Sequence, residues 1–505
     1  MSRFVCVHGH FYQPPRENPW TGLIDPQESA APFSDWNERI TAECYAPNVT
    51  PRAIAADGSL REFPSNYSRM SYNFGPTLLA WLEVHGPDVY RAVLAADRES
   101  RERYSGHGSA LAQAYNHMIL PLASARDRET QVYWGIRDFE HRFGRSPEGM
   151  WLPEAAVDLP TLETLARRGL RFTILAPQQA GRARRFADPD WTDVRGGRID
   201  PRIPYEVRLP SGRRIALFFY DGPLSHAVAF GELQRGGEHL AYRLEALFSE
   251  RPEPQLAHIA TDGETYGHHH RYGEVALAVA LDAIERGGRA RLTNYAEYLT
   301  LHPPQHEVEI VERTSWSCAH GLGRWTEDCS CRTAPHPGWT QSWRAPLREA
   351  LDWLRDGLSR RFEQSGAPLL ADPWRARDHA IEIVLDPSPR SVQDFLRRHA
   401  ARTLEPADQR AALALLEMQR YAMLMYTSCG WFFDDPSGLE TRQIIRYAGR
   451  ALEIAAGLGG EDLEGPFVRL LELARSNVAE SGHGRQIYEA LRMTSGARTP
   501  DGSDT

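Results

Sequence analysis

The stretch that most constrains the fold of this 505-residue chain is residues 255–270, QLAHIATDGETYGHHH. Its apolar start, residues 256–260, predicts a buried strand, which breaks into Asp262, Gly263 and Glu264 before three histidines. In α/β proteins, functional groups gather at the carboxyl ends of parallel strands, and a carboxylate there can exchange protons with a substrate. An acidic loop followed by a histidine-rich surface turn is the alternative interpretation.

A second apolar run, residues 150–156, also ends in a carboxylate, Glu154. Two carboxylates on separate strand ends are what glycoside hydrolysis requires. One attacks the anomeric carbon or stabilises its positive charge, and the other protonates the leaving oxygen. Trp151, at the end of the same run, offers a ring that suits the apolar face of a sugar.

Strand-like and helix-like segments alternate through the first 342 residues. Amphipathic helices are predicted at 128–143, 159–169, 240–249 and 274–286, and strands at 4–7, 147–151 and 171–176. A hairpin is predicted around Ser211-Gly212, and its second arm ends at Asp221, a third strand-end carboxylate and a candidate substrate contact. The order of these elements predicts a parallel sheet or barrel, with residues 180–200 as a basic loop.

The first predicted strand ends at His8 and His10, which are two residues apart and therefore point to the same side of an extended chain. This spacing suits metal binding or hydrogen bonds to sugar hydroxyls, and two structural histidines are the alternative.

From residue 343 onward the pattern is helical. Helices are predicted at 347–362, 379–385, 392–399, 407–426, 440–458 and 467–476. We expect a helical domain over residues 343–493 that packs on the catalytic face, followed by a disordered tail at 494–505. The aromatic and acidic loop 427–435, which contains Trp431, is expected to cap the catalytic face, with packing between domains as the alternative.

Cys318, Cys329, Cys331 and His336 are four residues of the types that bind zinc. The C-x-C pair is tighter than the usual C-x2-C spacing, so buried reduced thiols are the default interpretation. We therefore expect no metal and no cofactor.

Charge and hydropathy limit the partners. The 58 Lys and Arg against 67 Asp and Glu leave a net charge of −9, which predicts no nucleic-acid surface. No run approaches the ~20 apolar residues of a membrane helix. The N-terminus lacks a signal-like apolar region, so a cytoplasmic protein is expected, with its cysteines reduced.

Four segments resemble the motifs of glycoside hydrolase family 57, in the family's order over residues 8–267. They are His8-Gly9-His10-Phe11-Tyr12-Gln13-Pro14, Tyr115-Asn116-His117-Met118-Ile119-Leu120-Pro121, Trp151-Leu152-Pro153-Glu154 and Thr261-Asp262-Gly263-Glu264-Thr265-Tyr266-Gly267. The first has extra residues before Gln-Pro, and in the second Met118 replaces the family's proline.

The resemblance implies a retaining enzyme that acts on α-glucans. It also implies a fold that consists of an incomplete (β/α)7 barrel followed by a helical C-terminal region. It implies that Glu154 is the nucleophile and Asp262 the acid/base, about 5–5.5 Å apart. The residues alone do not choose Asp262 over Glu264. The remaining expected substrate contacts are His8, His10, His117, Trp151, Asp221, Tyr266, Trp316, His320 and Trp431.

Three functions remain open. The first is a hydrolase or transglycosylase on an oligo- or polysaccharide. The second is a metal-dependent carbohydrate deacetylase that would use His8, His10 and Asp262 as ligands. The third is a non-catalytic glycan-binding protein on a catalytic fold.

Overall fold

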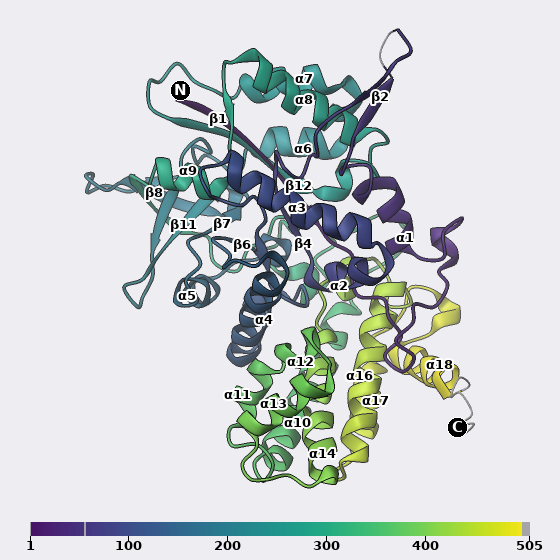
Figure 1. Cartoon of the computed structure of the whole chain (residues 1–505). Coiled ribbons are helices and arrows are strands. Elements are labelled where there is room, and N and C mark those ends of the chain that lie inside the picture. Colours follow the sequence, from purple (N-terminus) through teal and green to yellow (C-terminus); the bar gives the residue numbers. More distant parts are fainter. Residues whose placement is uncertain (1, 55–56, 497–505) are drawn as a thin grey trace. The chain divides into compact units, whose positions relative to one another are not determined.

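Strand β1 (Arg3–Phe11) lies in the middle of a four-stranded parallel sheet (Figure 1). The computed structural model describes residues 2–54 and 57–496. β1 pairs in parallel with β12 (Gln255–Asp262), β4 (Ser71–Phe74) and β13 (Arg291–Leu292). The register sets His10 opposite both Asp262 and Asn73. Three strands thus deliver polar side chains to one edge of the sheet.

Two further parallel pairs continue this array. β5 (Ala112–Gln113) pairs with β6 (Met150–Trp151), and β7 (Phe172–Leu175) pairs with β11 (Arg214–Phe219). Single parallel bridges, Tyr72 to Ala110 and Gly149 to Phe172, join the pairs. Within the described ranges, the parallel series is β12, β1, β4, β5, β6, β7 and β11, and no ladder joins β11 back to β12. The fold is therefore α/β, an incomplete (β/α)7 barrel, as expected.

Helices connect and cover these strands. They are α1 (Trp36–Ile40), α2 (Pro76–His85), α3 (Pro87–Arg103), α4 (Ala125–Phe143), α5 (Leu159–Arg167), α6 (Gly222–Phe230), α7 (Gly237–Glu245), α8 (Gly273–Gly287) and α9 (Tyr295–Leu301). The helices predicted around 128–143, 159–169, 240–249 and 274–286 correspond to α4, α5, α7 and α8.

β11 also belongs to a sheet that leaves the barrel. The sheet continues through β10 (Tyr205–Arg208), β14 (His306–Ile310), β8 (Ala180–Arg185) and β9 (Thr192–Asp193), and a separate hairpin joins β2 (Arg52–Ile54) to β3 (Leu60–Glu62). The prediction of a loop throughout 180–200 is wrong, because β8 pairs with the distant β14. Arg182 and Arg184 form ion pairs with Glu309 and Glu307 across this ladder. A strand held by cross-strand ion pairs lacks the apolar pattern by which strands are predicted.

The alternation of side chains along each strand explains how the core gives way to a polar end. Phe4 and Cys6 of β1 lie in one buried apolar cluster with Leu256 and Ala260 of β12. Successive side chains of a strand point to opposite faces, so the same face of β1 continues to His8 and His10, and that of β12 continues to Asp262.

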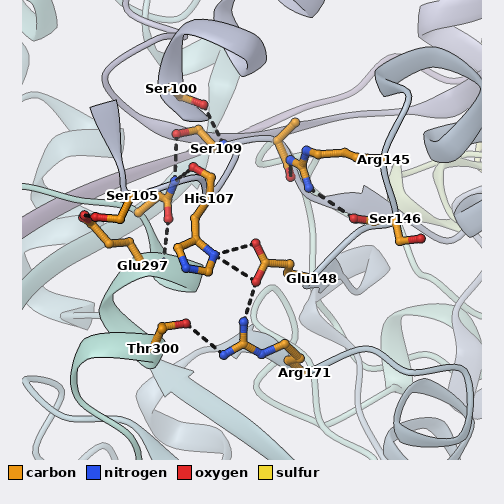
Figure 2. Close-up of polar contacts among 12 residues, drawn as sticks. Ser100, Ser105, His107, Ser109, Arg145, Ser146, Glu148, Arg171, Glu297 and Thr300 are labelled. Carbon is orange, nitrogen blue, oxygen red and sulfur yellow. Dashed lines mark hydrogen bonds and ion pairs between the residues drawn. The ribbon is translucent and has the colours of Figure 1, made fainter. Parts of the chain in front are cut away.

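A polar network lies where several strands begin, away from this end (Figure 2). Glu148, just before β6, contacts His107 at 2.8 Å from its Nδ1 and accepts from Arg171, just before β7. Arg171 also donates to Thr300 of α9. These contacts tie the amino ends of β6 and β7 to α9, which is the side of a barrel that serves stability.

The chain divides into two compact units. The first holds residues 1–15, 26–115 and 138–316, and the second holds 16–25, 116–137 and 317–505. The structural division thus falls after Trp316, whereas the sequence places a boundary at 342/343. The packing of the helical region on the catalytic face stays a prediction.

The second unit is helical, as the sequence predicts. α10, α14 and α16 pack on one another in the green-to-yellow part of the chain (Figure 1). Its helices are α10 (Arg344–Gly366), α11 (Pro373–His379), α12 (Ile381–Leu385), α13 (Pro389–His399), α14 (Pro406–Leu424), α15 (Cys429–Phe432), α16 (Leu439–Gly457), α17 (Glu464–Leu471) and α18 (Gly484–Gly496). The tail expected at 494–505 begins inside α18, and residues 497–505 lie outside the described residues. No helix of the described residues is long and apolar enough to cross a membrane.

Candidate active site

Glu154 occupies a strained turn directly after β6. The chain leaves Trp151 and forms a short 3-10 turn, Pro153–Ala155, in which Glu154 and Ala155 have φ angles of 59° and 48°. A non-glycine residue in this left-handed region costs about 1–3 kcal/mol and persists only where its surroundings enforce it. Trp316 does so, because its backbone N–H donates to the Glu154 carbonyl at 3.0 Å and its indole Nε1–H to Glu154 Oε2 at 3.1 Å. The carboxylate therefore has a fixed orientation.

Asp262 is the last residue of β12, and its side chain reaches solvent. Protein nevertheless surrounds the carboxyl closely, and this burial raises its pKa well above the usual range. The negative charges of Glu264 and Glu154 raise the pKa further. Asp262 is therefore a carboxyl that keeps its proton at a pH where an ordinary aspartate has lost it, and it lies within electrostatic reach of Glu154.

Glu264, two residues later, has a different environment. Its Oε1 accepts hydrogen bonds from the Tyr45 hydroxyl at 2.6 Å and from the Tyr12 backbone N–H at 3.0 Å. The side chain is buried, and burial raises its pKa to about 7 against the lowering effect of these hydrogen bonds. Because internal donors occupy Glu264, Asp262 is the better candidate for proton exchange with a ligand.

His8 and His10 lie side by side on β1, as their spacing predicts. Both rings stack on Trp151, with centroids 4.9 and 5.1 Å away. Burial lowers the pKa of each to about 3, so both are neutral at physiological pH. The edge of Trp151 in turn meets Trp316. These contacts link the end of β1 to the turn that carries Glu154.

Trp151 itself is fully buried in the apolar cluster. Its ring supports the two histidines, which leaves little of it for the face of a sugar. Trp316 is only half-buried and lies against Glu154, so it is an aromatic ring that a ligand can reach at this end of the barrel.

Sequence reasoning missed the role of Asn73 and Gln113. Asn73 Oδ1 lies 3.2 Å from His8 Nε2 and 3.3 Å from His10 Nδ1, and its Nδ2 donates to Gln113 Oε1 at 2.8 Å. Asn73 stands near the end of β4 and Gln113 ends β5. Their position at strand ends is the signal by which both could have been found.

Two other predicted contacts have local structural roles. The Asp221 carboxylate caps α6 by accepting from the Leu224 backbone N–H at 2.8 Å. Tyr266 is fully buried, and its carbonyl accepts from Asn48 at 2.7 Å.

The histidines of residues 268–270 form local contacts as well. His268 Nδ1 lies 2.5 Å from Glu43 Oε2, and His270 Nε2 lies 2.8 Å from the Ala229 carbonyl.

His117 and Trp431 belong to the second unit. His117 has a φ of 54°, and its Nδ1 lies 2.6 Å from Ser428 Oγ. Trp431 is fully buried, where its Nε1–H donates to the Arg344 carbonyl and its ring carries the Arg348 guanidinium at 4.3 Å. Packing inside the helical unit thus explains why the Trp431 ring is buried.

The metal ligands of the deacetylase alternative are not assembled. Among the described residues, the group of His, Cys, Asp or Glu side chains whose ligand atoms all lie within 4.8 Å is Cys318, His320, Cys329 and Cys331, not His8, His10 and Asp262. His320 therefore lies among the cysteines, in the place that the spacing along the sequence predicts for His336.

Two family models match separate parts of this chain. Residues 79–311 match the model of glycosyl hydrolase family 57, and residues 339–498 match a domain of unknown function, DUF3536. The alpha-amylase 1 of Dictyoglomus thermophilum is 23% identical over 207 residues, which is 41% of this chain but only 26% of the amylase. The chain therefore spans about a quarter of that relative.

Two solved structures share the fold over nearly the whole chain. The exo-type maltose-forming amylase of Pyrococcus sp. ST04 has a TM-score of 0.61 at 16% identity, covering 98% of this chain and 88% of that one. The family 57-type branching enzyme of Pyrococcus horikoshii has a TM-score of 0.56 at 17% identity, covering 98% and 95%. Residues 79–311, which include Glu154 and Asp262, are thus the part of this chain that matches glycosyl hydrolase family 57.

Proposed function

We propose that this protein is a retaining glycoside hydrolase or transglycosylase that acts on α-glucans. The observation that carries the proposal is the pair formed by Glu154, held in a strained turn, and Asp262, whose pKa is raised well above the usual range. A retaining mechanism needs one carboxylate as nucleophile and one protonated carboxyl as acid. The substrate class comes from the relatives, whose names are an alpha-amylase, a maltose-forming amylase and a branching enzyme.

In this mechanism Glu154 attacks the anomeric carbon while Asp262 protonates the departing oxygen. The Trp316 indole N–H keeps Glu154 Oε2 in place for the attack. Asp262, now ionised, then removes a proton from the acceptor, whose oxygen attacks the anomeric carbon and displaces Glu154. The product leaves with the original configuration, and the Glu154 carboxylate is free again. Water as acceptor makes the protein a hydrolase, and a sugar hydroxyl makes it a transglycosylase.

The neutral His10 suits the wall of the sugar subsite, and His8, which is fully buried with its ring nitrogens bonded to Ser71 and Asn73, supports it from below. A neutral imidazole both donates and accepts hydrogen bonds, which matches a sugar hydroxyl. Asn73 holds both rings, so the wall is rigid before a ligand arrives.

Azide rescue tests the two roles separately. Maltooligosaccharides and an α-glucosyl fluoride are incubated with the wild type, Glu154→Ala and Asp262→Ala, with and without azide. In Glu154→Ala, azide replaces the missing nucleophile in a single displacement, so we expect a β-glycosyl azide. In Asp262→Ala, azide attacks the glycosyl-enzyme in a second displacement, so we expect the α-glycosyl azide.

Glu250→Ala is the matched control, because Glu250 is an exposed carboxylate of the first unit. It should keep the wild-type product pattern. An α-glycosyl azide from Glu154→Ala and a β-glycosyl azide from Asp262→Ala would show that the two roles are reversed. Full activity in Glu154→Ala would refute its assignment as nucleophile. Wild-type binding of glucans without any turnover would instead indicate a glycan-binding protein, and release of acetate from acetylated sugars would indicate the deacetylase.

A further inference from the structure

Three cysteines and one histidine converge in the second unit, before α10. Cys318 Sγ lies 3.9 Å from Cys329 Sγ and 3.7 Å from Cys331 Sγ, and Cys331 Sγ lies 3.6 Å from His320 Nδ1. All four ligand atoms lie within 4.8 Å of one another. None of these residues takes part in the proposed glycosidase reaction.

These separations match a tetrahedral zinc site. With Zn–S bonds of about 2.3 Å and Zn–N bonds of about 2.0–2.1 Å, tetrahedral ligands lie roughly 3.8 Å apart for two sulfurs and about 3.6 Å apart for sulfur and nitrogen. A disulfide would instead bring two of the sulfurs to about 2.05 Å.

The charge of a neighbouring arginine is a second, independent observation. Arg344, the first residue of α10, is fully buried, and its Nη1 lies 3.6 Å from Cys329 Sγ while its Nη2 donates to the Cys331 carbonyl at 3.1 Å. Among the described residues, no carboxylate forms an ion pair with Arg344. Asp434, the acidic side chain nearby, accepts from the backbone N–H groups of Thr333 and Ala334.

A buried guanidinium is costly unless negative charge lies beside it. Zinc held by three thiolates and one neutral imidazole carries a net charge of one negative unit. Such a centre would add negative charge beside Arg344 to that of Asp434, and three neutral thiols would not.

We propose that Cys318, His320, Cys329 and Cys331 bind one zinc ion in a closed structural site. Binding releases the three thiol protons to solvent, and the four protein ligands leave no position for a substrate. The metal would hold the loop 318–331 against the start of α10. Cys318 follows Trp316 by two residues, so the site would also anchor the segment next to the indole that contacts Glu154.

His336, which the sequence spacing suggested, is not part of this group. Its ring stacks on Trp339 with centroids 4.1 Å apart. His320 and His336 are both histidines close to the three cysteines in sequence, so they form a matched pair for an experiment.

The test measures the zinc content of the full-length chain after purification with zinc and extensive dialysis. We expect about one zinc per chain in the wild type, in His336→Ala and in Cys429→Ser, and a loss of most of it in Cys331→Ser and His320→Ala. His320→Cys should restore zinc binding, because four thiolates also make a tetrahedral site. His320 is exposed, so its replacement leaves the apolar core intact.

Cobalt substitution reports the ligands directly. The wild-type chain loaded with Co²⁺ should show thiolate-to-cobalt charge-transfer absorption, which Cys331→Ser should weaken and His336→Ala should leave unchanged. A metal-free wild type with three titratable thiols, or with a disulfide among them, would overturn the proposal. Loss of zinc in His336→Ala but not in His320→Ala would overturn the ligand assignment. Neither result depends on glycosidase activity.

Discussion

At the scale of single residues, the surroundings of Asp262 and Glu264 separate two carboxyls that are alike in sequence. Both have pKa values raised first of all by burial. Glu264 Oε1 accepts hydrogen bonds from Tyr45 and Tyr12, whereas the Asp262 side chain reaches solvent. A proton donor has to meet its substrate, so the difference in hydrogen bonding favours Asp262 as the proposed acid.

Replacing Asp262 with asparagine should slow catalysis according to the leaving group. For maltooligosaccharides, whose leaving oxygen needs a proton, we expect kcat/KM to fall about 10²–10⁴-fold. For an α-glucosyl fluoride, which departs without protonation, glycosyl-enzyme formation should change little. Rates measured with both substrates check this, and equal losses would contradict the role of Asp262 as acid.

The raised pKa of Asp262 also predicts the basic side of the pH profile. The acid has to be protonated. The value of kcat/KM should therefore be highest below the pKa of Asp262 and decline as the pH rises through that pKa. Burial, Glu264 and Glu154 all raise this pKa, so the decline should begin at a higher pH than for an ordinary aspartate. The profile of Asp262→Asn with α-glucosyl fluoride should lack that decline. A decline at the same pH in the variant would assign it to another group.

At the scale of elements, β1 brings two neutral histidines into the end of the barrel. Trp151 covers one side of each ring, and Asn73 holds the polar edge. The strand can bury both side chains because they remain uncharged, and burial is the first cause of their lowered pKa values.

This arrangement predicts acid sensitivity of the fold. In the unfolded chain His8 and His10 bind protons near pH 6.5, whereas in the folded chain their pKa values are about 3. Below about pH 6.5 the unfolded state therefore binds more protons, so the free energy of unfolding falls as the pH decreases from about 6.5 to 3. Above that range the full stability is present.

His10→Gln should reduce this acid sensitivity, because glutamine does not titrate. Urea unfolding of the variant at several pH values between 4 and 7 measures the slope, and His226→Gln, at an exposed histidine, is the control. An unchanged slope in His10→Gln would show that other groups determine the acid sensitivity.

At the scale of the whole molecule, a buried arginine joins three helices of the second unit. In the second unit, Arg377 of α11 is buried and donates to Asp127 Oδ1 at 2.6 Å, Thr130 Oγ1 at 2.7 Å and Gln419 Oε1 at 3.2 Å. The contacts join α11, α14 and the first turns of α4, which lie far apart in sequence.

Arg377→Gln should destabilise the second unit by about 3–5 kcal/mol, because it leaves the Asp127 carboxylate buried without its partner. The double variant Asp127→Asn with Arg377→Gln should lose less than the sum of the two single changes. Denaturant unfolding, monitored by hydrogen exchange of the helical unit, measures the free energy of unfolding of the single and double variants. Additive losses would show that the two residues do not stabilise each other.

The sequence alone determined the fold class, most of the helices and the two strand ends that carry Glu154 and Asp262. These features depend on local patterns, since apolar periodicity defines helices and strands, and polar residues mark the ends of the strands. Tertiary structure decided the rest. It paired β8 with a strand more than a hundred residues away, buried Trp151 and left Trp316 beside Glu154.

Tertiary structure also showed that His320, and not His336, lies among the three cysteines. It further showed that Asp262 and Glu264 have different surroundings. Spacing along the chain is a one-dimensional measure, whereas metal ligands are residues whose ligand atoms lie within a few ångströms of one another in three dimensions. Likewise, the pKa of a carboxyl depends on the charges and hydrogen-bond donors that distant segments bring beside it. Those neighbours exist only once the chain has folded.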